Sequence, residues 1–262
     1  MKKRLGVFDS GLGGLTVVKE LVQAEIYEEI IYLGDTGRVP YGTRSVETII
    51  KYAKEDVNFL IEKNVTEIIV ACGTVSSVAM NVLKDYCPVP IVGMITKTII
   101  DAAKYTKNKK IGIIGTEAAI NNKAFESGLK NIDNSIKIIS ASCPLFVSLV
   151  EYGFVHEKEI IKKTCEYYLK EMKNFNIDTL IMGCTHFPIL KEYFNEYFEN
   201  ITLINMGISV ISKLTHHEKN VTNTSVRYYV TDSIDNFIKN ASIFYKGIDI
   251  SNVKKVELKT II

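Results

Sequence analysis

The sequence has no tryptophan, only five prolines and only five cysteines among its 262 residues. The cysteines are odd in number, and no two of them have CxxC spacing, which argues against a disulfide framework and against a four-thiolate zinc site. They are Cys72, Cys87, Cys143, Cys165 and Cys184. We therefore expect free thiols and a reducing, cytoplasmic environment.

The sequence also lacks an excess of one charge and a long hydrophobic run. Its 32 Lys and Arg are scattered among 30 Asp and Glu, so it lacks the concentrated basic face of a nucleic-acid binder. Polar residues and a glycine interrupt the longest apolar stretch, residues 68–83, which is therefore unsuited to crossing a bilayer. Asp9 ends the apolar run after the basic start, so we expect no export signal. A soluble protein without nucleic-acid or membrane partners is predicted.

Short β-branched runs alternate with stretches of helical period along the whole chain. Strands are predicted over residues 5–8, 30–33, 67–71, 89–92, 110–114, 136–140, 179–182, 201–204 and 227–230. Residues 45–63 place Ile49, Ala53, Val57 and Leu60 on one helical face. This alternation predicts an α/β fold of mostly parallel sheets covered by helices, with ligand sites beyond the carboxyl ends of the strands.

Small, hydroxylated and ionisable residues follow five of these strands. The segments are Asp9-Ser10-Gly11, Gly34-Asp35-Thr36, Cys72-Gly73-Thr74, Gly115-Thr116 and Gly183-Cys184-Thr185-His186. For a single loop, ordinary turn and N-cap residues are the favoured interpretation. Five such loops together indicate a site.

The Cys72 and Cys184 loops are alike, since in each a buried-type strand leads into Cys with Thr close behind. They lie nearly half the chain apart, which suggests two similar α/β halves that each present one thiol. Inverting an α-carbon requires a base on one face and an acid on the other, and a thiol with an ordinary pKa of about 8.5 can serve as either after modest tuning. The two thiols are therefore a candidate acid/base pair.

Several segments resemble glutamate racemases in order and spacing, from Leu5 to about Phe237. They are Val7-Phe8-Asp9-Ser10-Gly11-Leu12-Gly13-Gly14, Gly34-Asp35-Thr36, Pro40-Tyr41-Gly42, Ala71-Cys72-Gly73-Thr74, Cys143-Pro144-Leu145-Phe146-Val147 with Glu151 and Gly153, and Gly183-Cys184-Thr185-His186-Phe187-Pro188. The resemblance implies an isomerase that interconverts L- and D-glutamate without pyridoxal phosphate, any other cofactor or a metal. Its D-glutamate would supply peptidoglycan synthesis, and hence cell wall biogenesis and cell shape.

The resemblance also implies two α/β domains of like topology with the active site in the cleft between them. Residues 1–96 and 207–262 would form the first domain, which carries Cys72, and residues 97–206 the second, which carries Cys184. A homodimer is left open.

The roles of individual residues are carried over from the family. Cys72 would take the proton from D-glutamate and Cys184 from L-glutamate. Asp9 would assist Cys72, while His186 and Glu151 would assist Cys184, because a histidinium favours a nearby thiolate. Asp35 would act as a more distant support. Substrate would be bound by Ser10, Pro40, Tyr41, Gly42, Gly73, Thr74, Thr116, Thr185 and His186, through hydroxyls or backbone N–H groups.

Other interpretations compete for some of these residues. Cys87, Cys143 and Cys165 are predicted to be buried packing residues. Cys184 and His186 could ligate a metal, but no further Cys/His pair has ligand spacing. Residues 9–14 lack both the Lys-Ser/Thr of a P-loop and the dinucleotide glycine spacing. His156, His216 and His217 are predicted at the surface.

Several positions depart from the family pattern. Gly73 stands where most members have Asn and Ala119 where they have Thr, and farther out Thr96-Lys97 replace a Pro-Gly turn and Asn205 replaces Asp. An amide at position 73 would donate to a charged substrate group, so Gly73→Asn is expected to raise kcat/KM for glutamate. Three hypotheses remain: a glutamate racemase with an altered pocket, a racemase of aspartate or a larger acidic substrate that fills the space at Gly73 and Ala119, or a low-turnover binding or regulatory homologue. The first is favoured, since the acid/base residues are all present.

Overall fold

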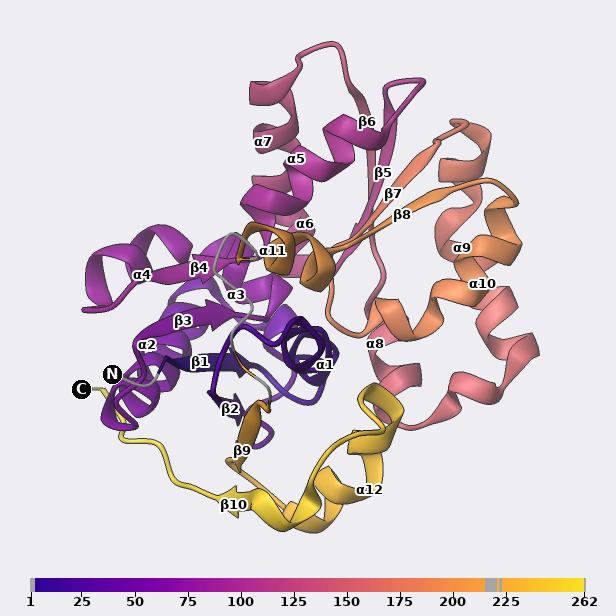
Figure 1. The fold of residues 1–262 in the computed structure, drawn as a ribbon. Coiled ribbons are helices and arrows are strands. Elements are labelled where there is room, and N and C mark those ends of the chain that lie inside the picture. The colour runs from indigo at the N-terminus through magenta and orange to yellow at the C-terminus, as the bar shows by residue number, and fades with distance from the viewer. Residues whose placement is uncertain (1–2, 215–220, 222, 262) are drawn as a thin grey trace.

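The computed structural model describes residues 3–214, 221 and 223–261, and within them ten strands form two sheets. One sheet contains β1 (Arg4–Asp9), β2 (Glu29–Gly34), β3 (Glu67–Val70), β4 (Ile91–Gly93), β9 (Ser225–Val230) and β10 (Val253–Lys255). The other contains β5 (Lys110–Gly115), β6 (Lys137–Ser142), β7 (Thr179–Met182) and β8 (Thr202–Asn205). Figure 1 shows the second sheet above and to the right of the first. Each strand pairing is parallel, as predicted.

The two sheets share a strand order. In the six-stranded sheet the order is β10-β9-β2-β1-β3-β4, and in the four-stranded sheet it is β6-β5-β7-β8. The series β2-β1-β3-β4 therefore corresponds to β6-β5-β7-β8, and β3 and β7 occupy equivalent positions. Each is followed after one small residue by a cysteine, Cys72 or Cys184. The similarity of the two cysteine loops thus has a counterpart in the topology.

The nine predicted strands are all present, with ends shifted by a few residues. The sequence did not predict β10, a three-residue strand paired with β9, because its Lys254 and Lys255 are exposed and leave no apolar pattern. Strand β2 is buried along its whole length, as expected for a parallel strand covered on both faces.

Helices cover both sheets. They are α1 (Leu15–Ala24), α2 (Val46–Glu62), α3 (Gly73–Val78), α4 (Met80–Tyr86), α5 (Ile95–Tyr105), α6 (Glu117–Asn121), α7 (Ala124–Ile132), α8 (Pro144–Glu151), α9 (Lys158–Asn174), α10 (Lys191–Phe198), α11 (Met206–Leu214) and α12 (Ile234–Phe244), with short 3₁₀ turns η1 (Tyr41–Thr43), η2 (Phe154–His156), η3 (Phe187–Leu190) and η4 (Ile250–Asn252). Among the described residues, no helix is both long and apolar enough to span a membrane.

Helix α2 confirms the predicted helix over residues 45–63. Ser45 caps its N-terminus by accepting a hydrogen bond from the N–H of Thr48, and Ile49, Ala53 and Leu60 are buried. The same helix also buries the carboxyl groups of Glu55 and Asp56, which the apolar pattern did not predict.

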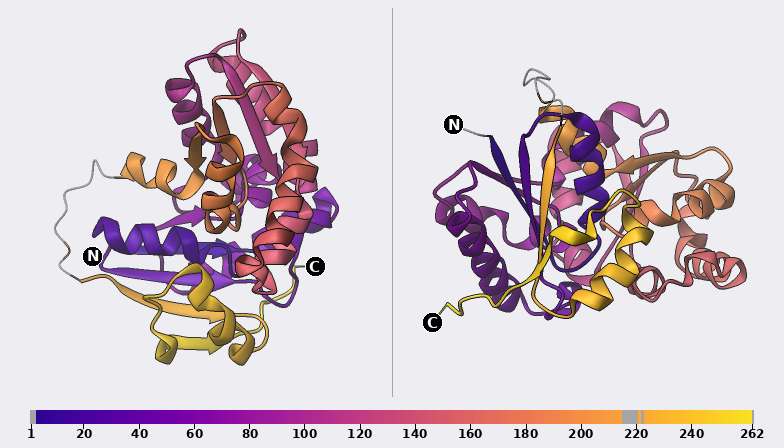
Figure 2. Two further views of the ribbon diagram at one scale, coloured as in Figure 1. Left: turned by 90° about the vertical axis from the view of Figure 1, so that its right-hand side faces the viewer. Right: turned by 60° about the horizontal axis from the view of Figure 1, so that its bottom comes forward.

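The chain passes from the first sheet to the second through α5 and returns through α11. Helix α11 packs against both α5 and α1, so the two connections lie side by side between the sheets (Figures 1 and 2). A continuous apolar core runs from β1 through these helices to β5 and β7, and a second core lies between β1–β3 and α2–α4. This packing brings the loops at the carboxyl ends of both sheets together.

Candidate active site

Loops of the two sheets meet through direct polar contacts. The Thr16 hydroxyl donates to the Thr185 carbonyl oxygen at 3.1 Å, and the Thr185 hydroxyl lies 3.4 Å from Asp9 Oδ1. The Thr74 and Thr116 hydroxyls lie 2.8 Å apart. Four of the five polar loops, those after β1, β3, β5 and β7, therefore converge, as the strand-end argument and the family resemblance together predicted.

Cys72 lies at the start of α3 and is only 3% exposed. Burial raises the pKa of its thiol to about 12, and the negative charges of Asp9 and Cys184 act in the same direction. The Val75 N–H and the Ser10 hydroxyl oppose this rise, and the Cys72 thiol donates to Ser10 Oγ at 3.6 Å. The surroundings of Cys72 thus favour the protonated thiol.

Asp9 ends β1 and is completely buried beside this thiol. Its Oδ2 accepts a hydrogen bond from the Gly11 N–H at 3.0 Å. Burial raises the pKa of Asp9, although the positive charge of His186 and the backbone N–H groups of Gly11 and Gly14 counteract part of the effect. Asp9 therefore lies between the two cysteine loops and responds to both.

Cys184 and His186 form a buried pair with Glu151. The Cys184 sulfur lies 3.5 Å from His186 Nδ1, and His186 Nε2 lies 2.5 Å from Glu151 Oε1. Burial of His186 works against its charged form, but Cys184 and Glu151 together raise its pKa well above the usual 6.5. An imidazolium donates from both ring nitrogens, so this geometry suits a histidinium held between a thiolate and a carboxylate.

Asp35 and Tyr41 lie further from the thiols, in a buried polar network. The Tyr41 hydroxyl donates to Asp35 and also lies 3.1 Å from Asp56 Oδ2. Because the Tyr41 hydroxyl is hydrogen-bonded within this network, we expect Tyr41 to bind substrate through its backbone and not through its side chain. Pro40, at the end of the same loop, is exposed and lines a pocket of about 470 Å³ together with Glu151.

The other predicted substrate-binding residues surround the thiols. Ser10, Thr74 and Thr185 are buried in the converging loops. Gly42 faces the second sheet so closely that a Cβ on it would lie 2.6 Å from the Cβ of Thr116. Except for Pro40, the Tyr41 hydroxyl and the Asp35 carboxyl, the predicted residues thus gather around the two cysteine loops.

Gly73 requires a correction to the sequence-based expectation. A Cβ at this position would lie 2.4 Å from the carbonyl oxygen of Gly183, a backbone atom on the loop before Cys184. Gly73→Asn would therefore push the two cysteine loops apart, and we expect it to lower activity instead of raising it. The same contact removes the empty space that a larger substrate was expected to fill at this position.

Of the remaining cysteines, Cys143 lies near enough to Cys184 for the charge of Cys184 to add to burial in raising the pKa of the Cys143 thiol. Cys143 and Cys165 are buried, as predicted, but Cys87 is only partly buried because it ends α4 at the edge of the first sheet. His156 is exposed, while His216 and His217 lie outside the described residues. Within the part of the chain that the structure describes, no group of three or more His, Cys, Asp or Glu side chains is arranged to hold a metal ion.

Sequence reasoning missed several residues that support the site. Thr16 links α1 to the Cys184 loop, and the Phe244 ring packs edge-on against His186 with centroids 5.4 Å apart. Glu55 and Asp56 reach Arg38, which also contacts Asp35. A signal existed for Asp56, since it lies on the apolar face of α2, seven residues after Ile49.

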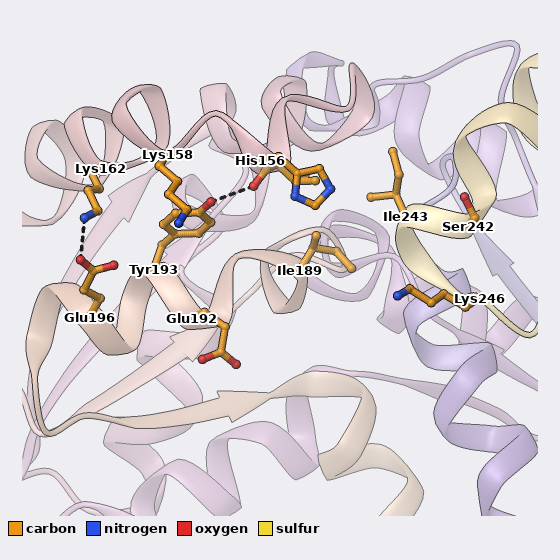
Figure 3. A pocket seen from close by; sticks show the side chains of 11 residues that line it. His156, Lys158, Lys162, Ile189, Glu192, Tyr193, Glu196, Ser242, Ile243 and Lys246 are labelled. Atoms are coloured by element: carbon orange, nitrogen blue, oxygen red, sulfur yellow. Dashed lines mark hydrogen bonds and ion pairs between the residues drawn. The ribbon is translucent and has the colours of Figure 1, made fainter.

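A separate groove of about 960 Å³ lies between α9, α10 and α12 (Figure 3). Lys162 pairs with Glu196 at 2.6 Å on one side, and the Tyr193 hydroxyl donates to the Val155 carbonyl at 2.9 Å. None of its lining residues belongs to the predicted site. This groove therefore lies outside the predicted active site.

Comparisons with known proteins agree on one family. The model of the Asp/Glu/hydantoin racemase family matches residues 12–214. A glutamate racemase of Hydrogenobaculum sp. is 44% identical over 89% of each chain, and one of Sulfurihydrogenibium sp. is 38% identical over 97% of each.

Solved structures give the same result. The glutamate racemase isoform RacE1 of Bacillus anthracis superposes with a TM-score of 0.90 at 32% identity, covering 98% of both chains. The glutamate racemase of Francisella tularensis in complex with D-glutamate has a TM-score of 0.86 at 34% identity, covering 98% of this chain and 97% of that one. This chain belongs to the glutamate racemases of the Asp/Glu/hydantoin racemase family.

Proposed function

We propose that the protein interconverts L- and D-glutamate by a two-base mechanism in which Cys184 and Cys72 act on opposite faces of the α-carbon. The observation that carries the proposal is the opposite surroundings of the two thiols. His186 and Glu151 favour a thiolate at Cys184, whereas burial and Asp9 favour a neutral thiol at Cys72. The family membership supports glutamate as the substrate.

The proton transfers follow from these protonation states. With L-glutamate bound, the Cys184 thiolate removes the α-proton and the Cys72 thiol delivers its own proton to the other face. The enzyme is left with a neutral Cys184 and a Cys72 thiolate, which is the form required by D-glutamate. The chemistry then needs no group beyond this chain's own side chains.

Substrate would be held by the loops around the thiols. The hydroxyls of Ser10, Thr74 and Thr185 and the backbone N–H groups of Tyr41 and Gly42 are donors suited to a dicarboxylate. Asp9 and Glu151 would instead act on the thiols, directly or through His186. Asp35 would support the Tyr41 loop from behind.

We propose the division into residues 1–96 with 207–262 and residues 97–206 as the two domains. It rests on sheet membership, since the strands within each part pair with one another in the two sheets. The role in the cell that fits this activity is the supply of D-glutamate for peptidoglycan in the cytoplasm.

The proposal is tested by racemisation in deuterium oxide. L-Glutamate is incubated with the enzyme, conversion is followed by circular dichroism, and the α-position is examined by NMR at low conversion. Two bases should give deuterated D-glutamate while the recovered L-glutamate stays largely unlabelled, because the delivered proton comes from a solvent-exchanged thiol.

Two outcomes would count against the proposal. Equal labelling of recovered substrate and product would indicate a single base. Parallel assays with aspartate and glutamine serve as controls, and faster turnover of either one would move the activity to another amino acid.

A further inference from the structure

We propose that Asp56, a residue of α2 outside the converging loops, positions the substrate-binding Tyr41–Gly42 segment by acting as a neutral hydrogen-bond donor. The proposal rests on the proposed function, since it assumes that this segment binds glutamate. Asp56 would touch neither the substrate nor the thiols. It is thus a positioning residue and not a catalytic one.

The argument begins with the number of protons available to the Tyr41 hydroxyl. This hydroxyl lies within hydrogen-bond distance of both Asp35 Oδ2 and Asp56 Oδ2. It carries one proton and can donate to only one carboxylate. If both acids were ionised, the hydroxyl oxygen would face a second anionic oxygen in a site from which water is excluded, because both carboxyl groups are 0% exposed.

A proton on Asp56 removes this conflict. The Asp56 O–H then donates to Tyr41 Oη, and the Tyr41 O–H donates to the Asp35 carboxylate. Asp35 also accepts hydrogen bonds from Arg38 Nε at 2.6 Å and from the Thr231 hydroxyl at 2.8 Å. Of the two carboxyl groups, Asp35 therefore has more hydrogen-bond donors around it. The hydrogen-bond chain therefore has one direction, from Asp56 to Asp35.

The charge balance of the network supports the same assignment. The ionisable groups that face Asp56 are Asp35, Arg38, Tyr41 and Glu55, with Arg38 Nη2 3.4 Å from Asp56 Oδ1. Three carboxyl groups thus share one guanidinium. Burial and then the charge of Asp35 raise the pKa of Asp56 well above its ordinary 3.8, although Arg38 and the hydrogen bond that Tyr41 can donate to the ionised form act in the opposite direction.

Glu55 shares Arg38 with Asp56 but has one further partner. It pairs with Arg38 and also accepts the backbone N–H of Ile261 at 3.0 Å, from the C-terminal segment. Within the described part of the chain, the side-chain hydrogen bonds of Asp56 are the 3.1 Å contact to Tyr41 and the 3.4 Å contact to Arg38. Of the three acids, Asp56 is consequently the one that gains most from being neutral.

The network connects to the site through the chain itself. Tyr41 begins η1, and the next residue, Gly42, packs against Thr116, whose hydroxyl contacts Thr74 beside the Cys72 loop. The Tyr52 ring packs on Tyr41 with centroids 5.4 Å apart. Anchoring the Tyr41 side chain therefore sets where the Gly42 backbone lies relative to both sheets.

The first experiment compares Asp56→Asn with Asp56→Leu. An Asn amide can still donate to Tyr41 and accept from Arg38, whereas Leu has a similar size and no donor. We expect Asp56→Asn to keep kcat/KM for glutamate within about twofold and Asp56→Leu to lose about tenfold, mainly through a higher KM. Thr164→Val is the matched control, because it removes a buried 2.7 Å hydrogen bond in α9, away from the network, and should leave KM unchanged.

Two kinetic outcomes would overturn the proposal. If Asp56→Asn loses as much as Asp56→Leu, an ionised Asp56 is required and the neutral donor is wrong. If Asp56→Leu keeps the wild-type KM, the network does not position the segment.

The second experiment measures Tm against pH and needs no turnover. A folded protein that keeps its proton on Asp56 above pH 3.8, where the unfolded chain releases it, loses stability as pH rises toward the raised pKa. Asp56→Asn has no proton to release, so its Tm relative to wild type should increase as pH rises above 3.8 toward the raised pKa of Asp56. A constant difference would overturn the neutral acid. Absence of racemisation by the wild type would refute the proposed function and leave this measurement valid.

Discussion

The two cysteine loops occupy equivalent places in two sheets of the same strand order, yet their electrostatic surroundings are opposite. Both thiols are almost fully buried, with 3% exposure for Cys72 and 6% for Cys184. Cys72 faces the carboxyl group of Asp9, while Cys184 faces the imidazole of His186. Equivalent backbone positions thus place two similar groups, and the neighbouring charges make them chemically different.

This difference is what a two-base reaction requires. Two thiols with the same surroundings would have the same protonation state. One face of the substrate α-carbon would then lack the base, or the other would lack the acid. Asp9 beside Cys72 and the His186–Glu151 pair beside Cys184 give the two thiols different surroundings. The equivalent strands β3 and β7 set only the positions of the two sulfur atoms. The electrostatic difference between the thiols comes from the side chains beside them.

Removing each thiol in turn tests most directly whether both are required. Cys72→Ala and Cys184→Ala should each lower racemisation by at least about 10³-fold, because each face needs its own proton carrier. Turnover is measured by circular dichroism on variants whose Tm shows that they fold. Cys165→Ala is the control, being 1% exposed and outside the site, and should keep wild-type turnover. Near-normal activity of either catalytic variant would reject the assignment.

Alkylation tests whether the two thiols differ in ionisation. At about pH 7.5, iodoacetamide should modify Cys184 at least about tenfold faster than Cys72, since the thiolate is the reactive form and the two exposures are similar. Peptide mass spectrometry gives the rates, and the partly exposed Cys87 reports on access of the reagent.

The same experiment on His186→Asn sharpens the result. Without the imidazolium, the preference for Cys184 should disappear and racemisation should fall about tenfold to a hundredfold, because the 3.5 Å contact of His186 Nδ1 with the Cys184 sulfur is lost. Faster modification of Cys72 than of Cys184 in the wild type would contradict the proposed protonation states.

The smallest expected effect concerns how closely the two cysteine loops approach. Gly73→Ala should lower kcat about tenfold, because its Cβ would lie 2.4 Å from the Gly183 carbonyl oxygen and the loops must separate. Gly128→Ala is the matched control: its Cβ would also lie 2.4 Å from an atom, but that atom is the terminal methyl of Ile99, which can rotate away. Equal activity of the two variants would show that this contact does not set the thiol positions.

Local patterns were sufficient for most of the architecture. The nine predicted strands and α2 follow from short apolar runs and from helical spacing, since burial on a sheet or helix face imposes those periods. The grouping of polar loops at one edge of each sheet followed as well, because parallel strands end at one edge, whereas the meeting of the two edges was implied only by the family resemblance. Strand β10 was not predicted because it is short and both of its lysines are exposed.

The sequence by itself predicted which residues would carry the chemistry, because the segments around Asp9, Cys72, Cys184 and His186 resemble those of glutamate racemases. The contacts and charge interactions among those residues depend on the tertiary structure. Three such interactions join segments far apart in the chain. They are the close approach of Gly73 to Gly183, the hydrogen bonds of the Tyr41 hydroxyl and the burial of Asp56. Hydrogen bonding, desolvation and steric exclusion depend on distances in space, and no periodicity along a single chain encodes them.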